Sequence, residues 1–151
     1  MLIRLEPGGF PETRDTVKPI LYLVADDERV LDALQSDLAR RFANDCRIES
    51  SKSPAPALRE LEDFAAASEP VALLIADHGM GEMTGVEFLV QAHRLHPSAK
   101  RILLIERNYT ADNPIVPAMT LGQIDYHLVK PWSPDVGLIP AVSEFLADWS
   151  E

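Results

Sequence analysis

Residues 71–77 read Val71-Ala72-Leu73-Leu74-Ile75-Ala76-Asp77, an apolar run that ends on a single carboxylate. A short apolar run bounded by polar residues is typical of a strand that is buried on both faces of a parallel sheet. In open parallel sheets, functional side chains gather at the carboxyl ends of the strands. Asp77 is therefore predicted to lie at the functional edge of such a sheet.

A second predicted strand ends on a cation. It reads Ile124-Asp125-Tyr126-His127-Leu128-Val129, and Lys130 and Pro131 follow it directly. If both strands belong to one parallel sheet, Asp77 and Lys130 come to the same edge. An aspartate beside a fixed ammonium group indicates an anionic acceptor held near a cation.

Strand-like and helix-like patterns alternate along the rest of the chain. Short apolar runs predict further strands at 20–25 and 101–105, and Arg47-Ile48-Glu49-Ser50 has a weaker strand pattern. Apolar residues at helical spacing predict helices that include residues 30–42, 57–67, 85–95 and 140–149. Residues 108–123 are expected to hold a short or irregular helix, because two prolines interrupt them.

Strands that alternate with helices predict a doubly wound α/β domain. Right-handed crossovers place helices on both faces of its five-stranded parallel sheet, and the expected strand order is the flavodoxin-like order 2-1-3-4-5. This order brings together the ends of the first, third and fifth strands, which carry Asp26, Asp27, Asp77 and Lys130. Residues 1–17 are expected to form a flexible leader before a single domain at 18–151.

The composition fits one domain of ordinary size, with 151 residues of which 46% are hydrophobic. A net charge of −10 argues against a general nucleic-acid binder, which needs a basic surface. The single cysteine, Cys46, excludes an internal disulfide, favours a cytoplasmic setting and is expected to be buried. No signal peptide or membrane span is expected, because no apolar stretch approaches about 20 residues. His93 and His96 are expected at the surface.

The predicted edge has a chemical use. Carboxylates that meet there repel one another, and a hard cation such as Mg²⁺ relieves the repulsion because it binds carboxylate oxygens and keeps several waters. Lys130 adds a further positive charge. A metal ion and an ammonium group beside Asp77 suit phosphoryl transfer onto that carboxylate, with an aspartyl phosphate as the product.

The motif around Asp77, taken with Lys130 and Pro131, resembles a known family. Residues 74–85 read Leu74-Ile75-Ala76-Asp77-His78-Gly79-Met80-Gly81-Glu82-Met83-Thr84-Gly85. This run and the lysine–proline pair resemble the receiver domain of two-component response regulators. The resemblance covers about Lys18 to Glu151, nearly all of the chain.

The resemblance implies a phosphorelay receiver rather than an enzyme. Asp77 would accept a phosphoryl group from a histidine kinase, a phosphotransfer protein or a small phospho-donor, with Lys130 at the same site. The resemblance also implies a Mg²⁺ cofactor, held at Asp26, Asp27, Asp77 and Gly79. The phosphorylated domain would then regulate a partner or a fused output domain.

Four features depart from the family's pattern, the first being Gly81 in place of the usual loop proline. Two adjacent acids are usual after the first strand, and these positions fall at Ala25 and Asp26, or one residue later. The usual hydroxyl residue at the end of the fourth strand falls at Ile105 or Glu106, neither of which has a hydroxyl group. The aromatic switch position on the fifth strand falls at His127. We therefore expect the acceptor to survive, while the conformational response to phosphorylation stays open.

A closer resemblance concerns the partner. Lys130-Pro131-Trp132 and residues 84–89 and 145–149 look like receivers that stand in front of thioredoxin-reductase-like flavoproteins. Such a flavoprotein, another output domain or a second copy of this chain is therefore an expected partner. The alternative is a degenerate receiver that serves as a phosphorylation-independent interaction or dimerisation module. A flavin-binding electron carrier is disfavoured, because the loop after the first strand is acidic and would repel a phosphate.

Overall fold

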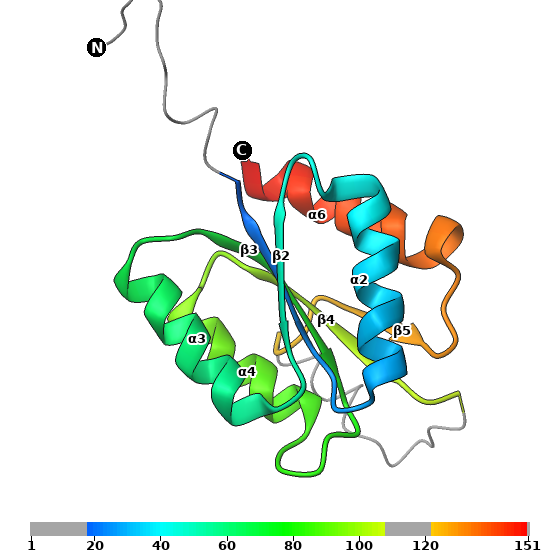
Figure 1. Ribbon diagram of the computed structural model, residues 1–151, viewed down its shortest axis with the longest axis horizontal. Helices are drawn as coiled ribbons and strands as arrows, with labels where there is room; N and C mark the ends of the chain where they lie inside the picture. Colours follow the sequence, from blue (N-terminus) through cyan, green and yellow to red (C-terminus); the bar gives the residue numbers. More distant parts are fainter. Residues whose placement is uncertain (1–17, 108–121, 151) are drawn as a thin grey trace, which may run out of the picture.

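The computed structural model describes residues 18–107 and 122–150. These residues form a five-stranded parallel sheet in the order β2-β1-β3-β4-β5. The strands are β1 (Ile20–Val24), β2 (Arg47–Ser51), β3 (Val71–Asp77), β4 (Lys100–Ile105) and β5 (Tyr126–Val129). The predicted strand order is confirmed, and β3 lies at the centre of the sheet (Figure 1).

Helices cover both faces of the sheet, as predicted (Figure 1). One face carries α2 (Glu28–Phe42) and α6 (Ile139–Ser150), which follows a π-helical turn, η1 (Pro134–Leu138). The other face carries α3 (Pro54–Ala66) and α4 (Gly85–Leu95). The irregular helix expected at 108–123 falls largely outside the described residues. Within the described part of the chain, no helix combines the length and apolar character that a membrane crossing needs.

Both faces of β3 are buried, which explains its unbroken apolar sequence. Leu74 and Ala76 belong to the core under α3 and α4, whereas Leu73 and Ile75 belong to the core under α2 and α6. Full burial of one such leucine or isoleucine stabilises the fold by about 1.5–3 kcal/mol. The strand that carries Asp77 is therefore anchored from two sides.

The starts of α3 and β5 differ most from those predicted. α3 starts earlier, at Pro54, because proline fits the first turn of a helix, where main-chain N–H groups have no partner within the helix. β5 starts later, at Tyr126 rather than Ile124. Just before it, the Asp125 carboxylate accepts a hydrogen bond from the main-chain N–H of Arg101 at 2.8 Å, which holds the chain at the entrance to the strand.

The prediction that His96 lies at the surface is wrong. His96 is 8% exposed, and its Nε2 atom lies 2.8 Å from the main-chain oxygen of Leu61. The ring therefore ties the end of α4 to α3, a contact between two helices that residue spacing along one helix does not reveal. His93 is half-buried, and Cys46 is buried as predicted.

Candidate functional site

Asp77 is the last residue of β3, and its side chain is almost fully buried. The next main-chain N–H, from His78, donates to the oxygen of Leu104 and keeps the end of β3 in register with β4. Gly85, at the start of α4, packs on the same segment, since a Cβ atom there would lie 2.6 Å from the main-chain oxygen of Asp77. Only glycine lets α4 begin this close, so neighbouring main chain fixes the position of Asp77.

The structure brings Lys130 directly to Asp77. The Nζ atom of Lys130 lies 3.0 and 2.9 Å from the two carboxylate oxygens of Asp77. The main-chain N–H of Lys130 donates to the oxygen of Ile105 at 2.8 Å, which extends the pairing of β4 with β5 as far as the lysine. The peptide bond between Lys130 and Pro131 is cis. The side chains of Lys130 and Asp77 are 15% and 3% exposed, so water and salt screen the attraction between them weakly.

Glu106 joins this pair and makes a cluster of three charged residues. Its Oε2 atom lies 2.7 Å from Nζ of Lys130, so the ammonium group contacts two carboxylates. Burial lowers the pKa of Lys130, but its bonds to Glu106 and Asp77 outweigh burial and raise that pKa above the ordinary value. Ile105, the other candidate for the switch position, is buried in the core. Glu106 is therefore the candidate that faces the site.

The register of β1 against β3 determines which acid follows the strand. Val24 pairs with Ala76, so the next residue, Ala25, comes level with Asp77. Ala25 is fully buried and offers no carboxylate. Asp26 is thus the first acid after β1 at this edge.

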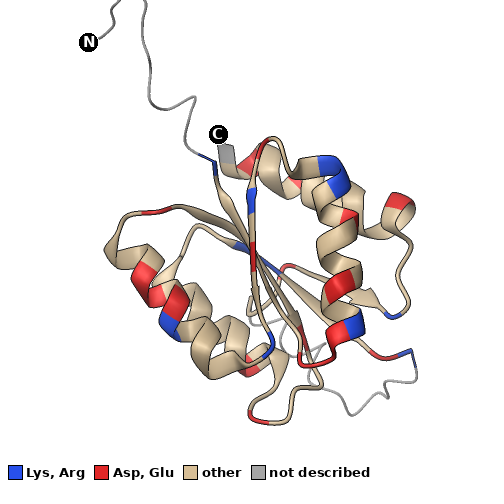
Figure 2. Cartoon of the chain, viewed as in Figure 1, with Lys and Arg blue, Asp and Glu red and all other residues tan. Residues whose placement is uncertain are grey.

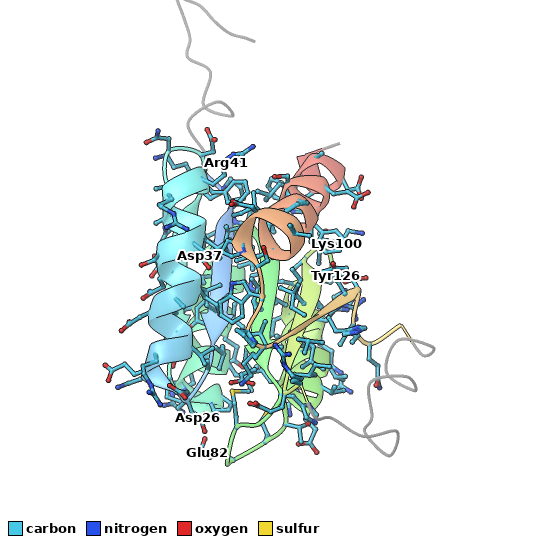
Figure 3. All side chains as sticks on the ribbon, turned by 90° about the vertical axis from the view of Figure 1, so that its right-hand side faces the viewer. Asp26, Asp37, Arg41, Glu82, Lys100 and Tyr126 are labelled. Carbon is cyan, nitrogen blue, oxygen red and sulfur yellow. The ribbon has the colours of Figure 1, made fainter. Side chains whose placement is uncertain are left out.

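Asp26 and Asp27 are both exposed but have different partners. The Oδ2 atom of Asp26 accepts a hydrogen bond from the main-chain N–H of Gly81, in the loop after β3, at 3.4 Å. Figure 3 shows Asp26 at the same end of the molecule as Glu82 of that loop. Asp27 instead caps α2, where its carboxylate accepts from the N–H of Arg29 at 2.9 Å. Acidic segments at the start of α2 and in the loop make this end of the molecule negative (Figure 2).

The groups at this edge are oxygen donors, the type of ligand that Mg²⁺ binds. Asp26 and Asp77 bring carboxylates from neighbouring strands, and Gly79 brings a main-chain carbonyl from the loop. Within residues 18–107 and 122–150, no three His, Cys, Asp or Glu side chains form a metal-binding group. Mg²⁺ tolerates such a thin set because it keeps several waters and is usually bound through one or two carboxylates. Structural zinc, which is enclosed by protein ligands, does not fit it.

His127 lies on β5, which is an edge strand, and is half-buried. Its ring centroid is 6.5 Å from that of Tyr126, and the ring of Tyr126 packs edge-on against Phe145 of α6. Tyr126 is 37% exposed. The position predicted for an aromatic switch therefore lies beside an aromatic ring that already reaches the surface.

A groove of about 530 Å³ borders the charged cluster, and no sequence pattern points to it. Its lining comes from α2, the end of β4 and the segment after β5: Asp27, Arg29, Val30, Ala33, Asp37, Glu106, Lys130, Pro131 and Trp132. The Nε1 atom of Trp132 donates to Oδ2 of Asp37 at 2.9 Å, which fixes the indole against α2. In the sequence Asp37 is one more acid on an amphipathic helix, so only the structure shows this bond.

Comparison with known proteins gives a partial match in sequence. No protein-family model matches the chain. The hydrogenase transcriptional regulatory protein HoxA of Cupriavidus necator is 31% identical over 119 residues. The match covers 78% of this chain and 22% of HoxA, so the chain spans about a fifth of the length of that relative.

Solved structures with the same architecture include several receiver domains. The signal receiver domain of an HD domain-containing protein from Pseudomonas fluorescens Pf-5 has a TM-score of 0.72 and 28% identity, over 88% of this chain and 90% of that one. A CheY-like receiver domain protein from Methanospirillum hungatei JF-1 has a TM-score of 0.73 and 24% identity, over 88% and 97%. The BeF3-activated DrrB receiver domain has a TM-score of 0.65 and 21% identity, over 87% and 99%. This chain therefore has the receiver-domain fold of response regulators.

Proposed function

We propose that this chain is a receiver domain of a phosphorelay, in which Asp77 accepts a phosphoryl group with the help of Lys130 and Mg²⁺. The observation that carries the proposal is the buried ion pair, with Nζ of Lys130 at 2.9 and 3.0 Å from the two oxygens of Asp77. It lies where the strands of a receiver-type sheet end. A fixed ammonium group there stabilises negative charge on a transferring phosphoryl group, and it needs no rearrangement of solvent.

The donor is a phosphohistidine on a kinase or a phosphotransfer protein, or a small acyl phosphate. One carboxylate oxygen of Asp77 attacks the phosphorus atom, and a new O–P bond forms. The bond from phosphorus to the nitrogen or oxygen of the donor breaks, and its electron pair leaves with the donor. The product is an aspartyl phosphate, a mixed anhydride that water later hydrolyses.

The residues at the edge have separate roles in this proposal. Lys130 donates hydrogen bonds to Asp77 before transfer and to the phosphoryl oxygens after it. Asp26, Asp77 and the carbonyl of Gly79 would hold Mg²⁺, which would neutralise charge on the phosphoryl oxygens. Asp27, whose carboxylate caps α2, supports the helix rather than the metal ion in this arrangement.

The output lies in a partner or in a fused domain. HoxA is named as a transcriptional regulator, and the matched segment makes up 22% of it, which supports a receiver joined to a larger output. Residues 84–89 and Lys130-Pro131-Trp132 resemble receivers that precede thioredoxin-reductase-like flavoproteins. Such a flavoprotein, in the cytoplasm, is therefore the first partner to test, and a second copy of the chain is the next.

The alternative is a docking module that ignores phosphorylation. It accounts for the missing hydroxyl at the end of β4, but it gives no role to the buried pair of Asp77 and Lys130. The two functions differ in their response to Asp77→Asn. A docking module would bind its partner equally well with this substitution, whereas the affinity of a receiver for its partner would no longer respond to a phospho-donor.

The proposal is tested by intact-mass measurement after incubation with Mg²⁺ and acetyl phosphate. The unmodified sequence should gain one phosphoryl group, and Asp77→Asn should gain none. Asp45→Asn is the matched control, because Asp45 is an exposed aspartate in the turn after α2 and should leave the gain intact. A gain that persists in Asp77→Asn, or no gain in any protein, would overturn the proposal.

A further inference from the structure

One contact in the cluster belongs to neither the acceptor nor the metal site. Glu106 follows β4, at one of the two positions where the resemblance to receiver domains predicts a hydroxyl group. Its Oε2 atom lies 2.7 Å from Nζ of Lys130, which is as close as the two oxygens of Asp77. The same ammonium group thus serves a buried acceptor and an exposed carboxylate.

We propose that Glu106 is an internal competitor for Lys130 and so limits anion binding at Asp77. The ligand is a tetrahedral anion on the Asp77 carboxylate, either a phosphoryl group or its beryllofluoride mimic. To bind Lys130, this anion must displace the Glu106 carboxylate or lie beside it. This inference rests on the proposed function and adds to it a positioning residue that acts through Lys130.

The charges in the cluster support competition. Asp77 and Glu106 carry two negative charges and Lys130 carries one positive charge, so the cluster is already negative before any anion arrives. A phosphoryl group or beryllofluoride on Asp77 would add negative charge close to Glu106, and the two like charges would repel each other. In place of Glu106, a hydroxyl group would donate a hydrogen bond to the anion, whereas a carboxylate only accepts.

The exposure of Glu106 shows that the competition is adjustable rather than absolute. Its side chain is 69% exposed, so the carboxylate can move into water at little cost. The core contact at the end of β4 is made by the preceding residue, Ile105, which is 7% exposed. Removing the charge of Glu106 should therefore change anion binding and leave folding nearly unchanged.

The test is the affinity for beryllofluoride in the presence of Mg²⁺, followed by the amide signals of residues 78–85. Glu106→Gln keeps the shape of the side chain and removes its charge. Glu28→Gln is the matched control, since Glu28 is 71% exposed, lies at the start of α2 and pairs with Lys52 rather than Lys130. Asp77→Asn is the negative control, because it lacks the carboxylate to which beryllofluoride binds and its amide signals should not shift.

We expect Glu106→Gln to bind beryllofluoride about three- to tenfold more tightly than the unmodified chain, a modest effect because the side chain is largely exposed. Glu28→Gln should bind like the unmodified chain. The gain in Glu106→Gln should shrink at high salt, since screening weakens the repulsion that it removes. Beryllofluoride binding by Glu106→Gln and not by the unmodified chain would also support the inference, because Glu106 would then prevent binding altogether.

Three results would overturn the inference, and they differ in whether the proposed phospho-accepting site would remain. Equal affinities for the unmodified chain and Glu106→Gln would remove the competitor but leave the phospho-accepting site in place. Equal gains in Glu106→Gln and Glu28→Gln would do the same, since the effect would then be one of net charge. Binding to neither the unmodified chain nor Glu106→Gln would sink the inference and the proposed function together.

Discussion

The buried half of the site and its exposed rim are built in different ways. The side chains of Asp77 and Lys130 are 3% and 15% exposed, and main chain from two strands and one helix fixes their positions. On the rim, the side chains of Asp27 and Glu106 are 46% and 69% exposed. Asp77 and Lys130 follow the receiver pattern described above, whereas Glu106 lies on the exposed rim, at one of the two positions where that pattern has a hydroxyl group.

The difference shows where this fold tolerates change. Removing one partner of a buried ion pair leaves a charge without compensation, which costs about 3–5 kcal/mol. An exposed ion pair contributes about 0–1 kcal/mol, so a rim residue can be replaced without loss of the fold. An exposed departure such as Glu106 can therefore be accommodated while the buried pair of Asp77 and Lys130 is kept.

The largest expected effect comes from Lys130→Met. This substitution leaves Asp77 buried without its cation and should lower the free energy of unfolding by about 3 kcal/mol, as well as abolish phosphorylation. Urea unfolding measures the change. Lys52→Met is the matched control, because Lys52 is 59% exposed, lies 3.7 Å from Glu28, and should cost less than about 1 kcal/mol. Similar losses of unfolding free energy in both variants would contradict the contrast between the buried ion pair and exposed ones.

Gly85→Ala should have the next largest effect. A Cβ atom at this position would lie 2.6 Å from both the main-chain oxygen of Asp77 and Cδ1 of Leu103, so α4 must shift. Such overpacking costs about 1–3 kcal/mol, and the shift should also slow phosphorylation of Asp77. Gly81→Ala is the control, because a Cβ atom there meets nothing within 4 Å. Thermal unfolding of Gly85→Ala that matched the control would contradict the close packing of α4 on β3.

The smallest effects separate Asp26 from Asp27, two exposed acids that follow β1. Asp27→Ala removes the cap of α2 and should cost about 1 kcal/mol of stability, while magnesium affinity stays the same. Asp26→Asn should leave stability unchanged and weaken magnesium binding by about tenfold or more, since even partners of metal ligands have effects of that size. Calorimetric titration with Mg²⁺ and urea unfolding test both variants. If Asp27→Ala weakened magnesium binding as much as Asp26→Asn, the carboxylate of Asp27 would have to leave the cap when the metal ion binds.

The sequence predicts the sheet well because its signals are local. Residues 71–76 are apolar on both faces of the strand, and such a pattern fits few structures besides a central parallel strand. Asp77 and Lys130 could be paired in advance because strand order alone brings their strands to one edge. This prediction needs only the order of the strands and no knowledge of how individual side chains pack.

The features that sequence reasoning missed depend on contacts between distant residues. The bond of His96 to Leu61 links two helices, and the bond of Trp132 to Asp37 crosses from the segment after β5 to α2. The choice between Ile105 and Glu106 depended on a one-residue register at the end of β4. In the structure Ile105 is buried in the core and the carboxylate of Glu106 contacts Lys130.

The most direct test of the central claim is to locate the phosphoryl group chemically. Borohydride reduces an aspartyl phosphate to homoserine, so peptide mass spectrometry after treatment with Mg²⁺, acetyl phosphate and borohydride identifies the acceptor residue. We predict homoserine at position 77 and nowhere else, and none when the phospho-donor is omitted. Reduction at another acid, such as Asp26, or no reduction at position 77, would contradict the account of Asp77 as a phosphoryl acceptor held by Lys130.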